Sequence, residues 1–468
     1  MSAGTDAVTT SNPVDGSPLA TYPAMGPNDV EAAVVSGHRA AAAWGLVPVA
    51  DRAAGLATLA AHLRADAERY AALVTAEMGK PLAEARGEVE KSAVTADYYA
   101  GHAEHILRRR AVEIDSPANV SAFVQPEPLG LVLAVMPWNF PVWQVMRFAI
   151  PTLAAGNGVL LKHSPNVTGS ALALADACVA AGFPEHLVTT LVVAEPEVPE
   201  TVGRLIADPR IAAVTLTGSN RAGEMVGAAA GRASKKSVLE LGGSDAFVVL
   251  ADADVPAAAA AAVRARFTNS GQSCVCAKRF VVEEPVAAEF TRLFLEGVAA
   301  LVLGDPTDPA TTVGPLARAD LRDALQRQVD ESVAAGATLA AGGRSVDGPG
   351  CFYEPTVLLD VHPGMAVFDE ETFGPVAAVA VAHDEEHAVA LADATQYGLG
   401  LSVWSRDTER AIDVARRITS GAAFVNAVVA SDPRVPFGGT RRSGYGRELA
   451  EAGVLEFTNQ RTYWVASA

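Results

Sequence analysis

The sequence has few cysteines for its length: four in 468 residues, at Cys178, Cys274, Cys276 and Cys351. A scaffold held together by disulfides needs a far higher density of cysteine, so that class of protein is excluded. So few thiols suit a reducing compartment. We therefore expect the protein to be cytoplasmic.

Positive charge is also in short supply. Lys and Arg number 36 against 54 Asp and Glu, which gives a formal net charge of −18. This excess of negative charge disfavours nonspecific attraction to nucleic acid phosphates and to anionic lipid. We expect no nucleic acid partner, and the expected partners are small molecules and further copies of the same chain.

Long hydrophobic runs are missing as well. The longest stretch of small apolar residues, "VPAAAAAAV" at 255–263, falls well short of the ~20 residues that span a bilayer. The amino-terminal stretch "MSAGTDAVTTSNPVDG" has neither a basic start nor an apolar run. We expect no membrane span and no signal peptide.

The periodicity of the chain predicts two α/β domains and a separate arm. From about 28 to 101, apolar residues recur at three-to-four spacing, which predicts helices. Residues 107–128 predict two polar strands around a Ser-Pro turn at Ser116, and the tail from Gly453 predicts a strand that could pair with them. Elsewhere short apolar strands alternate with helices, which is typical of parallel sheets covered on both faces. We predict a nucleotide-binding domain over 1–106 and 129–240, a second α/β domain over 241–435, and an oligomerisation arm formed by 107–128 and 453–468.

A glycine-containing turn suggests a phosphate site. In "TLTGSNRAGEMV", Gly218 and Gly223 lie between a predicted strand and a predicted helix, where backbone N–H groups and the helix dipole can hold a phosphate. The spacing is not the usual dinucleotide fingerprint, and the Lys-Ser/Thr of a P-loop is absent, so nucleoside triphosphate hydrolysis is disfavoured. A plain strand-to-helix turn is the alternative.

Lys162 ends the apolar strand "GVLLK", at the edge of a parallel sheet where nucleotides bind. The following "HSPN" has no Asp or Glu to accept hydrogen bonds from a ribose 2′-hydroxyl. A 2′-phosphate is therefore not repelled, and Lys162, His163, Ser164 and Arg221 could all favour it, which indicates NADP. The alternative is a lysine that only snorkels from the end of the strand.

The segment "NSGQSCVCAKR" at 269–279 holds two of the four cysteines. An aldehyde carbon has no hydride to give until a nucleophile has added, and a cysteine thiolate adds well, leaving a thioester that water hydrolyses. The residues alone do not choose between Cys274 and Cys276, and for either one the alternative is a small buried hydrophobe. If the segment is extended, both side chains point the same way, so a regulatory Cys274–Cys276 disulfide is a further hypothesis.

Six ordered motifs extend over nearly the whole chain. They are "MPWNFP" (136–141), "TGSNRAG" (217–223), "LELGG" (239–243), "NSGQSCVCAKR" (269–279), "EETFGPV" (370–376) and "PFGGTRRSGYGRE" (436–448). In these motifs the sequence resembles the aldehyde dehydrogenase superfamily. The resemblance implies an aldehyde dehydrogenase-like α/β fold with a Rossmann-type cofactor domain, an α/β catalytic domain and a small β oligomerisation arm, and it implies NADP or NAD as the cofactor.

The resemblance also implies the roles of individual residues. Cys274 would be the nucleophile, Asn139 the oxyanion donor together with the Cys274 backbone N–H, and Glu240 the general base for deacylation. Contacts with the cofactor are implied for Pro137, Trp138, Lys162, Ser164, Gly218, Ser219, Gly223, Leu241, Glu371 and Phe373. The alternatives are a helix-capping role for Asn139, a paired buried carboxylate for Glu240 and a solvated loop around Glu371.

The closer resemblance is to the succinic semialdehyde dehydrogenase branch. The carboxylate-binding arginine of that branch falls on Arg147, and the alternative is an ordinary helix arginine paired with a neighbouring acid. Some members carry a second arginine where this sequence has Thr268. Arg434 could approach the entrance from another loop instead.

We therefore expect an NAD(P)-dependent enzyme that oxidises succinic semialdehyde, or a similar short semialdehyde, to the carboxylate. A broad aliphatic or aromatic aldehyde dehydrogenase is the alternative among enzymes, and Glu240 disfavours a coenzyme A-acylating relative. The alternative of another class is a non-catalytic binding or structural protein on the same fold. We expect a homodimer or homotetramer, and we expect no metal because the histidines lack ligand spacing.

Overall fold

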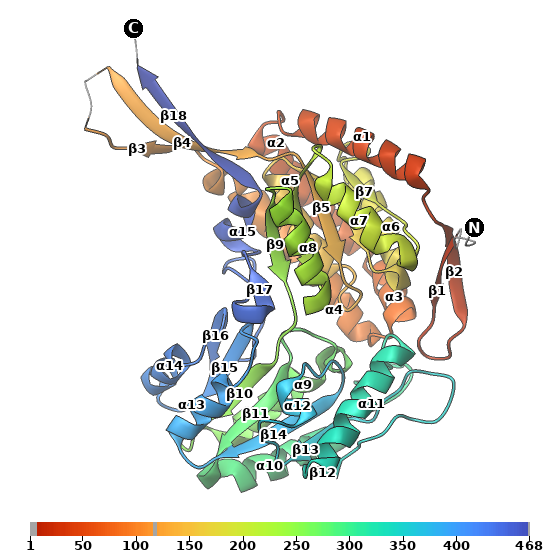
Figure 1. The fold of residues 1–468 in the computed structure, drawn as a ribbon, viewed down its shortest axis with the longest axis vertical. Coiled ribbons are helices and arrows are strands. Elements are labelled where there is room, and N and C mark those ends of the chain that lie inside the picture. The colour runs from red at the N-terminus through yellow and green to blue at the C-terminus, as the bar shows by residue number, and fades with distance from the viewer. Residues whose placement is uncertain (1–6, 116–118, 467–468) are drawn as a thin grey trace.

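The computed structural model of the protein describes residues 7–115 and 119–466. Figure 1 shows two α/β lobes and an arm of strands that projects from one of them. The Ser-Pro turn predicted at Ser116 lies outside the described residues. No helix in these two ranges is long and apolar enough to cross a membrane.

The first lobe contains a six-stranded sheet in the order β17-β9-β8-β5-β6-β7, parallel except for β17. Its strands are β5 (Leu131–Met136), β6 (Gly158–His163), β7 (Val188–Thr190), β8 (Ile211–Thr217), β9 (Lys236–Glu240) and β17 (Gly444–Tyr445). Both faces are covered, since Leu131 and Leu133 of β5 pack with one group of helices while Val132 and Ala134 pack with another. This two-sided burial explains why the parallel strands have nearly continuous apolar sequences.

The helices of the first lobe divide between the two faces of this sheet. One face is covered by α1 (Pro27–Trp44), α7 (Val198–Ala207) and α8 (Asn220–Arg232). The other is covered by α2 (Val49–Ala65), α3 (Ala67–Met78), α4 (Leu82–Ile106), α5 (Trp143–Ala154) and α6 (Thr168–Ala180). A hairpin of β1 (Ala7–Ser11) and β2 (Pro18–Pro23) and the short 3-10 turns η1 (Pro165–Val167) and η2 (Glu195–Glu197) complete the lobe.

The second lobe contains a seven-stranded sheet in the order β12-β13-β14-β11-β10-β15-β16, parallel except for β12. Its strands are β10 (Asp245–Val249), β11 (Ala277–Glu283), β12 (Thr338–Ala341), β13 (Thr356–Leu359), β14 (Val376–Ala382), β15 (Gly400–Trp404) and β16 (Ala422–Val425). Helices α9 (Val255–Phe267) and α10 (Glu284–Ala299) cover one face. The other face carries α11 (Ala319–Ala334), α12 (Ala366–Asp369), α13 (Glu385–Asp393) and α14 (Thr408–Arg416).

The chain crosses between the lobes twice, before the interior strand β10 and after the edge strand β16. It leaves the first sheet at Glu240 and enters the second at Asp245. After β16 it returns through η4 (Arg441–Ser443) to β17, where Gly444 pairs with Glu240. The carboxyl end of β9 is thus held by a segment that comes back from the second lobe.

The arm is a three-stranded sheet in the order β18-β4-β3. Strand β18 (Thr458–Ala466) pairs antiparallel with β4 (Val120–Pro128), which also pairs with β3 (Arg110–Val112). The expected pairing of the tail with residues 107–128 is therefore present. The expected start of the tail strand was wrong, because Gly453 lies in α15 (Ala450–Glu456), whose buried Gly453 and Val454 pack on the lobe before the strand begins.

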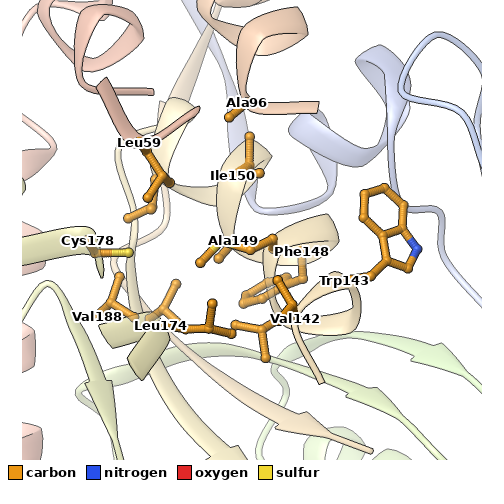
Figure 2. Close-up of a cluster of buried hydrophobic side chains, with 14 of the residues drawn as sticks. Leu59, Ala96, Val142, Trp143, Phe148, Ala149, Ile150, Leu174, Cys178 and Val188 are labelled. Atoms are coloured by element: carbon orange, nitrogen blue, oxygen red, sulfur yellow. The ribbon is translucent and has the colours of Figure 1, made fainter. Parts of the chain in front are cut away.

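Helix α5 is buried on every side, and all twelve of its residues are shielded from solvent. Figure 2 shows Phe148, Ala149 and Ile150 among side chains of α2, α4 and α6 such as Leu59, Ala96 and Leu174. The first amides of α5 are satisfied from outside the helix, because Val142 N–H and Trp143 N–H both donate to Glu88 Oε1 at 2.8 Å. A helix packed so tightly gives the side chains at its start a fixed position.

A substitution at Gly444 tests whether the pairing of β17 with β9 stabilises the fold. The φ of Gly444 is +109°, and an added Cβ would lie 1.9 Å from the Leu239 carbonyl oxygen. We expect Gly444→Ala to lower the free energy of unfolding by several kcal/mol, at least about 2 kcal/mol more than a positive φ alone costs. Gly182→Ala is the matched control, because Gly182 has φ +90° with open space around its Cα. Thermal melting of both variants measures the difference. Equal destabilisation of the two variants would contradict a close approach of β17 to Leu239.

Candidate active site

The carboxyl ends of the first sheet face the second lobe across a cavity of about 410 Å³, which we call the strand-end cavity. Residues that follow four parallel strands reach it: Asn139 after β5, Lys162 at the end of β6, Gly218 after β8 and Glu240 at the end of β9. Cys274 enters from the second lobe. In open α/β sheets this edge is where ligands bind.

A second cavity of about 330 Å³ lies between α4, α5, α9 and the loop that follows β16, and we call it the α4–α5 cavity. Arg147, Trp143 and Phe437 line it, together with Glu88 and Lys91 of α4. Cys274 and Gln144 line both cavities. The thiol therefore lies where the two cavities meet.

Most of the predicted site residues come together. The strand-end cavity is lined by Pro137, Trp138, Asn139, Lys162, Ser164, Gly218, Ser219, Glu240, Leu241, Cys274, Glu371 and Phe373. Gly223 lies behind it in α8, where an added Cβ would approach Leu241 Cδ2 to 2.4 Å. Its role is therefore close packing of α8 against Leu241 rather than direct lining.

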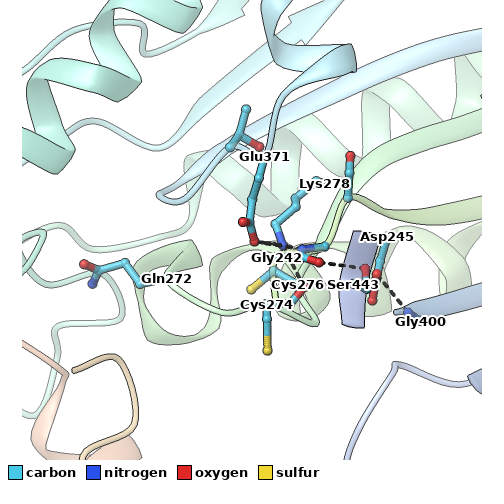
Figure 3. Close-up of polar contacts among 12 residues, drawn as sticks. Gly242, Asp245, Gln272, Cys274, Cys276, Lys278, Glu371, Gly400 and Ser443 are labelled. Carbon is cyan, nitrogen blue, oxygen red and sulfur yellow. Dashed lines mark hydrogen bonds and ion pairs between the residues drawn. The ribbon is translucent and has the colours of Figure 1, made fainter. Parts of the chain in front are cut away.

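Cys274 lies in a turn between η3 (Thr268–Gly271) and β11. Burial raises the pKa of its thiol to about 12, although the cations of Arg147 and Lys278 oppose the rise. Figure 3 shows Lys278 between Glu371 and the Cys274 loop. Lys278 Nζ donates to the Cys274 carbonyl at 2.7 Å and lies 3.1 Å from Glu371 Oε1.

Cys276 is also a free thiol, and it approaches the Thr268 carbonyl at 3.8 Å. The premise of the disulfide hypothesis was an extended segment, and this premise was wrong because Cys276 N–H closes a turn onto the Ser273 carbonyl at 3.4 Å. The side chains at positions 274 and 276 therefore do not have the orientation of an extended strand. A disulfide between them stays a prediction.

Asn139 is buried in the turn between β5 and α5. Its Nδ2 donates to the Gln272 carbonyl at 3.0 Å, which leaves the second N–H of the amide for another acceptor. It does not cap α5, because Glu88 accepts the hydrogen bonds at that terminus.

Glu240 is buried, and neither of its carboxylate oxygens forms a hydrogen bond with a side chain in the described ranges, while the backbone of Gly439 lies close enough to stabilise the charged form. Burial raises the pKa of this carboxyl well above its ordinary value, and the neighbouring Glu448 raises it further. Arg147 and Arg447 oppose the rise. A carboxyl with a raised pKa is a stronger base once it is ionised, which suits proton abstraction from water.

Arg147 lines the α4–α5 cavity, but its charge is already compensated. Its guanidinium forms an ion pair with Glu448, in which both side chains are 2% exposed, and lies 4.7 Å from the Phe437 ring centroid. One of its nitrogens also donates to Thr217 Oγ1 at 3.4 Å. Arg434, in contrast, is exposed, pairs with Asp432 and lines neither of the two cavities.

His163 does not face the strand-end cavity, so its expected contribution to phosphate binding was wrong. Its Nδ1 accepts from Ser164 N–H at 2.9 Å, and its Nε2 lies 3.0 Å from the Pro141 carbonyl. Burial lowers the pKa of this imidazole to about 4, so the ring is neutral and structural. Arg221 lines an adjoining, mainly apolar cavity between α7 and α8, which we call the α7–α8 cavity.

Three residues of the site were not predicted from the sequence. Gln144 lines both cavities, Lys278 ties the Cys274 loop to Glu371, and Lys91 reaches the α4–α5 cavity from a helix more than 180 positions before Cys274. Lys278 belongs to a quoted motif, and its position four residues after the cysteine was the only available hint. Within the described ranges, no three or more of His, Cys, Asp and Glu are grouped to hold a metal ion.

The raised pKa of Cys274 predicts slow alkylation that accelerates with pH. Because the thiolate fraction grows about tenfold per pH unit below the pKa, we expect the rate of Cys274 modification by iodoacetamide to rise steadily between about pH 7 and 9. Lys278→Met should slow the reaction, since it removes a nearby cation, while Lys278→Arg should not. Peptide mass spectrometry separates Cys274 from the other thiols, and a rate that levelled off below pH 8 would contradict the burial effect.

Comparison with known proteins identifies the family. Residues 1–463 match the aldehyde dehydrogenase family. The Escherichia coli protein named succinate semialdehyde dehydrogenase NAD(P)+ Sad is 46% identical over 453 residues, which cover 97% of this chain and 96% of that protein. Succinate-semialdehyde dehydrogenase NADP(+) 1 of Mycobacterium tuberculosis is 45% identical over 459 residues, 98% of this chain and 100% of that protein.

Solved structures agree in fold. The crystal structure of succinic semialdehyde dehydrogenase from Streptococcus pyogenes in complex with NADP+ superposes with a TM-score of 0.94 at 35% identity, covering 98% of this chain and 100% of that chain. The α/β fold with a Rossmann-type domain, expected from the six motifs, is confirmed. The chain belongs to the aldehyde dehydrogenase family.

Proposed function

We propose that the protein oxidises succinic semialdehyde, or a similar short semialdehyde, to the carboxylate with NADP or NAD. The observation that carries the proposal is the position of Cys274 at the junction of two cavities, with Asn139 and Glu240 lining the same space. The names of the relatives at 45 to 46% identity support the substrate and the cofactor.

The residues of the strand-end cavity fit a nicotinamide dinucleotide. Lys162 is buried there with no hydrogen bond or ion pair to any described residue, and burial lowers the pKa of its ammonium to about 8. A buried cation without a partner suits ribose hydroxyls or a phosphate. Gly218 and Ser219 open α8 beside it, where backbone amides would hold the pyrophosphate.

The α7–α8 cavity would accommodate the adenine ring. It shares Val135, Leu216 and Ala222 with the strand-end cavity, and it is otherwise lined mainly by apolar side chains such as Val202 and Met225. At the other end, Trp138 and Phe373 form an edge-to-face pair with centroids 5.5 Å apart, and Glu371 is fixed by Lys278. These groups would hold the nicotinamide ribose and ring near Cys274.

The chemistry begins when the Cys274 thiol gives up its proton to water and the resulting thiolate adds to the aldehyde carbon. The carbonyl oxygen becomes an oxyanion, and the free N–H of the Asn139 amide would stabilise it together with the Cys274 backbone N–H, which makes no hydrogen bond to any described residue. The bound nicotinamide supplies the acceptor for the hydride that leaves the adduct. The carbon left on Cys274 is then a thioester.

Glu240 would complete the cycle. Its carboxylate takes a proton from a water molecule, the resulting hydroxide attacks the thioester carbon, and the Cys274 sulfur leaves as the acid product departs. The unbonded oxygens of Glu240 support this role, because both are available to accept the proton. The raised pKa places the loss of activity on acidification above the ordinary range of a glutamate.

The second candidate is a broad-specificity aliphatic or aromatic aldehyde dehydrogenase. The pairing of Arg147 with Glu448 favours it, because a compensated guanidinium gives less preference for a charged substrate. A non-catalytic protein on this fold is disfavoured by the intact set of Cys274, Asn139 and Glu240.

The arm supports a homodimer or homotetramer. Strand β18 is exposed along most of its length, with Trp464 62% exposed, and it extends away from its own lobe. An exposed aromatic on a projecting strand fits coverage by another copy of the chain. A cytoplasmic location is proposed as well, supported by four cysteines that are all free.

The first test compares succinic semialdehyde with butanal, an uncharged aldehyde of the same chain length, each with NADP and with NAD. We expect kcat/KM to be at least about tenfold higher for the charged aldehyde, or ~1.4 kcal/mol in transition-state binding. Cys274→Ser should lose oxidation of both, while Cys276→Ser should keep it. Equal rates for the two aldehydes would favour the broad enzyme, and full activity of Cys274→Ser would exclude the cysteine mechanism.

Glu240→Gln separates the two halves of the reaction. We expect rapid formation of about one equivalent of reduced cofactor per active site, followed by turnover at least about a hundredfold slower than in the wild type, because the thioester waits for a general base. Stopped-flow absorbance follows the burst, and intact-protein mass spectrometry detects the acyl group. Loss of the burst itself would show that Glu240 acts before hydride transfer.

A further inference from the structure

One face of α4 forms a wall of the α4–α5 cavity. Glu84, Gly87, Glu88 and Lys91 follow one another at three-to-four spacing and all line the cavity. The cavity also contains Cys274. A substrate bound to Cys274 would therefore meet this face of α4 on its other side.

The two carboxylates on this face are committed to other contacts. Glu84 Oε2 accepts from Asn269 N–H at 2.6 Å. Glu88 accepts from the first two amides of α5 and forms a buried ion pair with Lys80. Neither carboxylate forms an ion pair with a cation that lines the cavity, although the charge of Glu88 acts on Lys91.

Arg264 of α9 also lines the cavity and forms no ion pair in the described ranges, but it is exposed and donates to the Ala260 carbonyl at 3.4 Å, so the more buried cation that remains is Lys91. Its Nζ donates to Ser431 Oγ at 2.7 Å and lies 4.5 Å from the Trp143 ring centroid. It forms no ion pair with any carboxylate of the described chain. Asp432, the nearest acid on the facing loop, is bound by Arg434 at 2.6 Å. An ammonium has three N–H donors, and Ser431 accepts only one of them.

Arg147 differs from Lys91 in this respect. Its ion pair with Glu448 already compensates its charge, and the guanidinium also packs on Phe437 and donates to Thr217. If a substrate carboxylate displaced Glu448, a buried and unpaired glutamate would be left behind, which is costly. Thr268, which lines the same cavity, adds no charge.

We propose that Lys91, positioned by Ser431 and Trp143, binds the distal carboxylate of the substrate and sets the preference for semialdehydes. Arg147 then acts as a positioning residue, because it holds Glu448 near Glu240 and shapes the cavity wall. The inference rests on the proposed oxidation of a short semialdehyde and assigns its specificity to α4. It also explains how a chain with Thr268 in the place of a second arginine could still select an anionic substrate.

The environment of Lys91 gives this recognition a pH dependence. Burial, and next the cation of Arg147, lower the pKa of the ammonium to about 8, while Glu88, Asp432 and Cys274 raise it. Below about pH 8 the side chain is charged and attracts a carboxylate. As the pH rises through this value the charge is lost, so the preference for the charged aldehyde should fall.

The test measures the ratio of kcat/KM for succinic semialdehyde to that for butanal in the wild type, Lys91→Met, Lys91→Arg and Arg147→Met. Taking the ratio cancels the titration of Cys274 and Glu240, which both aldehydes share. We expect Lys91→Met to lower the ratio at least about tenfold, because KM for the charged aldehyde rises far more than KM for butanal. Lys91→Arg should keep most of the ratio and should hold it above pH 9.

Inhibition by succinate, measured with butanal as the substrate, gives a second readout. We expect succinate to compete in the wild type and to lose at least about tenfold in affinity in Lys91→Met. Arg292→Met is the matched control, because it removes one positive charge from an exposed ion pair on α10 outside both cavities, and it should change neither quantity.

The outcomes separate the inference from the function on which it rests. A wild-type enzyme with no preference for the charged aldehyde would overturn the proposed semialdehyde function. A clear wild-type preference that Lys91→Met retains, and that Arg147→Met loses selectively, would overturn the role of Lys91. If Lys91→Met does not fold, the wild-type pH profile decides, because a ratio that stays constant between about pH 7 and 10 contradicts an ammonium with a pKa of about 8.

Discussion

The Glu88 carboxylate is the contact on which both cavities depend. It projects from α4, accepts hydrogen bonds from the first two amides of α5 and pairs with the buried Lys80. The first amides of a helix have no partner inside the helix, so a carboxylate placed there satisfies them and interacts favourably with the helix dipole. Because α5 is buried on all sides, this single group fixes the turn that carries Asn139, the start of α5 and the wall of the α4–α5 cavity together.

Buried charge in the site is organised mostly as pairs. Lys80 with Glu88, Arg147 with Glu448 and Lys278 with Glu371 each place opposite charges in contact. Pairing of this kind offsets the cost of removing an ion from water. Some groups of the site form no ion pair within the described ranges, among them Glu240, Lys162 and Lys91. Charged side chains that are buried without compensation are candidates for contact with a substrate or cofactor.

Both lobes contribute residues to the site. The first sheet presents the ends of four parallel strands, and the second lobe supplies Cys274, Glu371 and Phe373 from loops beside its own sheet. The return of the chain through β17, next to Glu240, ties the lobes a second time. A cofactor at the strand ends and an aldehyde beside α4 would thus reach Cys274 from different sides, which is the arrangement that hydride transfer requires.

The sequence by itself determined the class of fold and the family, and it predicted which residues react. Apolar strands alternating with helices can only be buried in a covered parallel sheet, and the motifs around Asn139, Glu240 and Cys274 lie directly after such strands or in the loop that meets them.

Only the tertiary structure decided how the charges are shared. Arg147 and Glu448 are separated by 301 positions in the chain and Lys91 and Ser431 by 340, and no periodicity links them. His163 is a further example of what the sequence did not decide. Its neighbours in sequence suggest a phosphate site, but the ring is buried beneath the Pro141 turn and is structural. The spacing of apolar residues in a segment reflects which of its faces is buried. Pairing between side chains that are distant in sequence depends on how the folded elements pack, and no single segment carries that information.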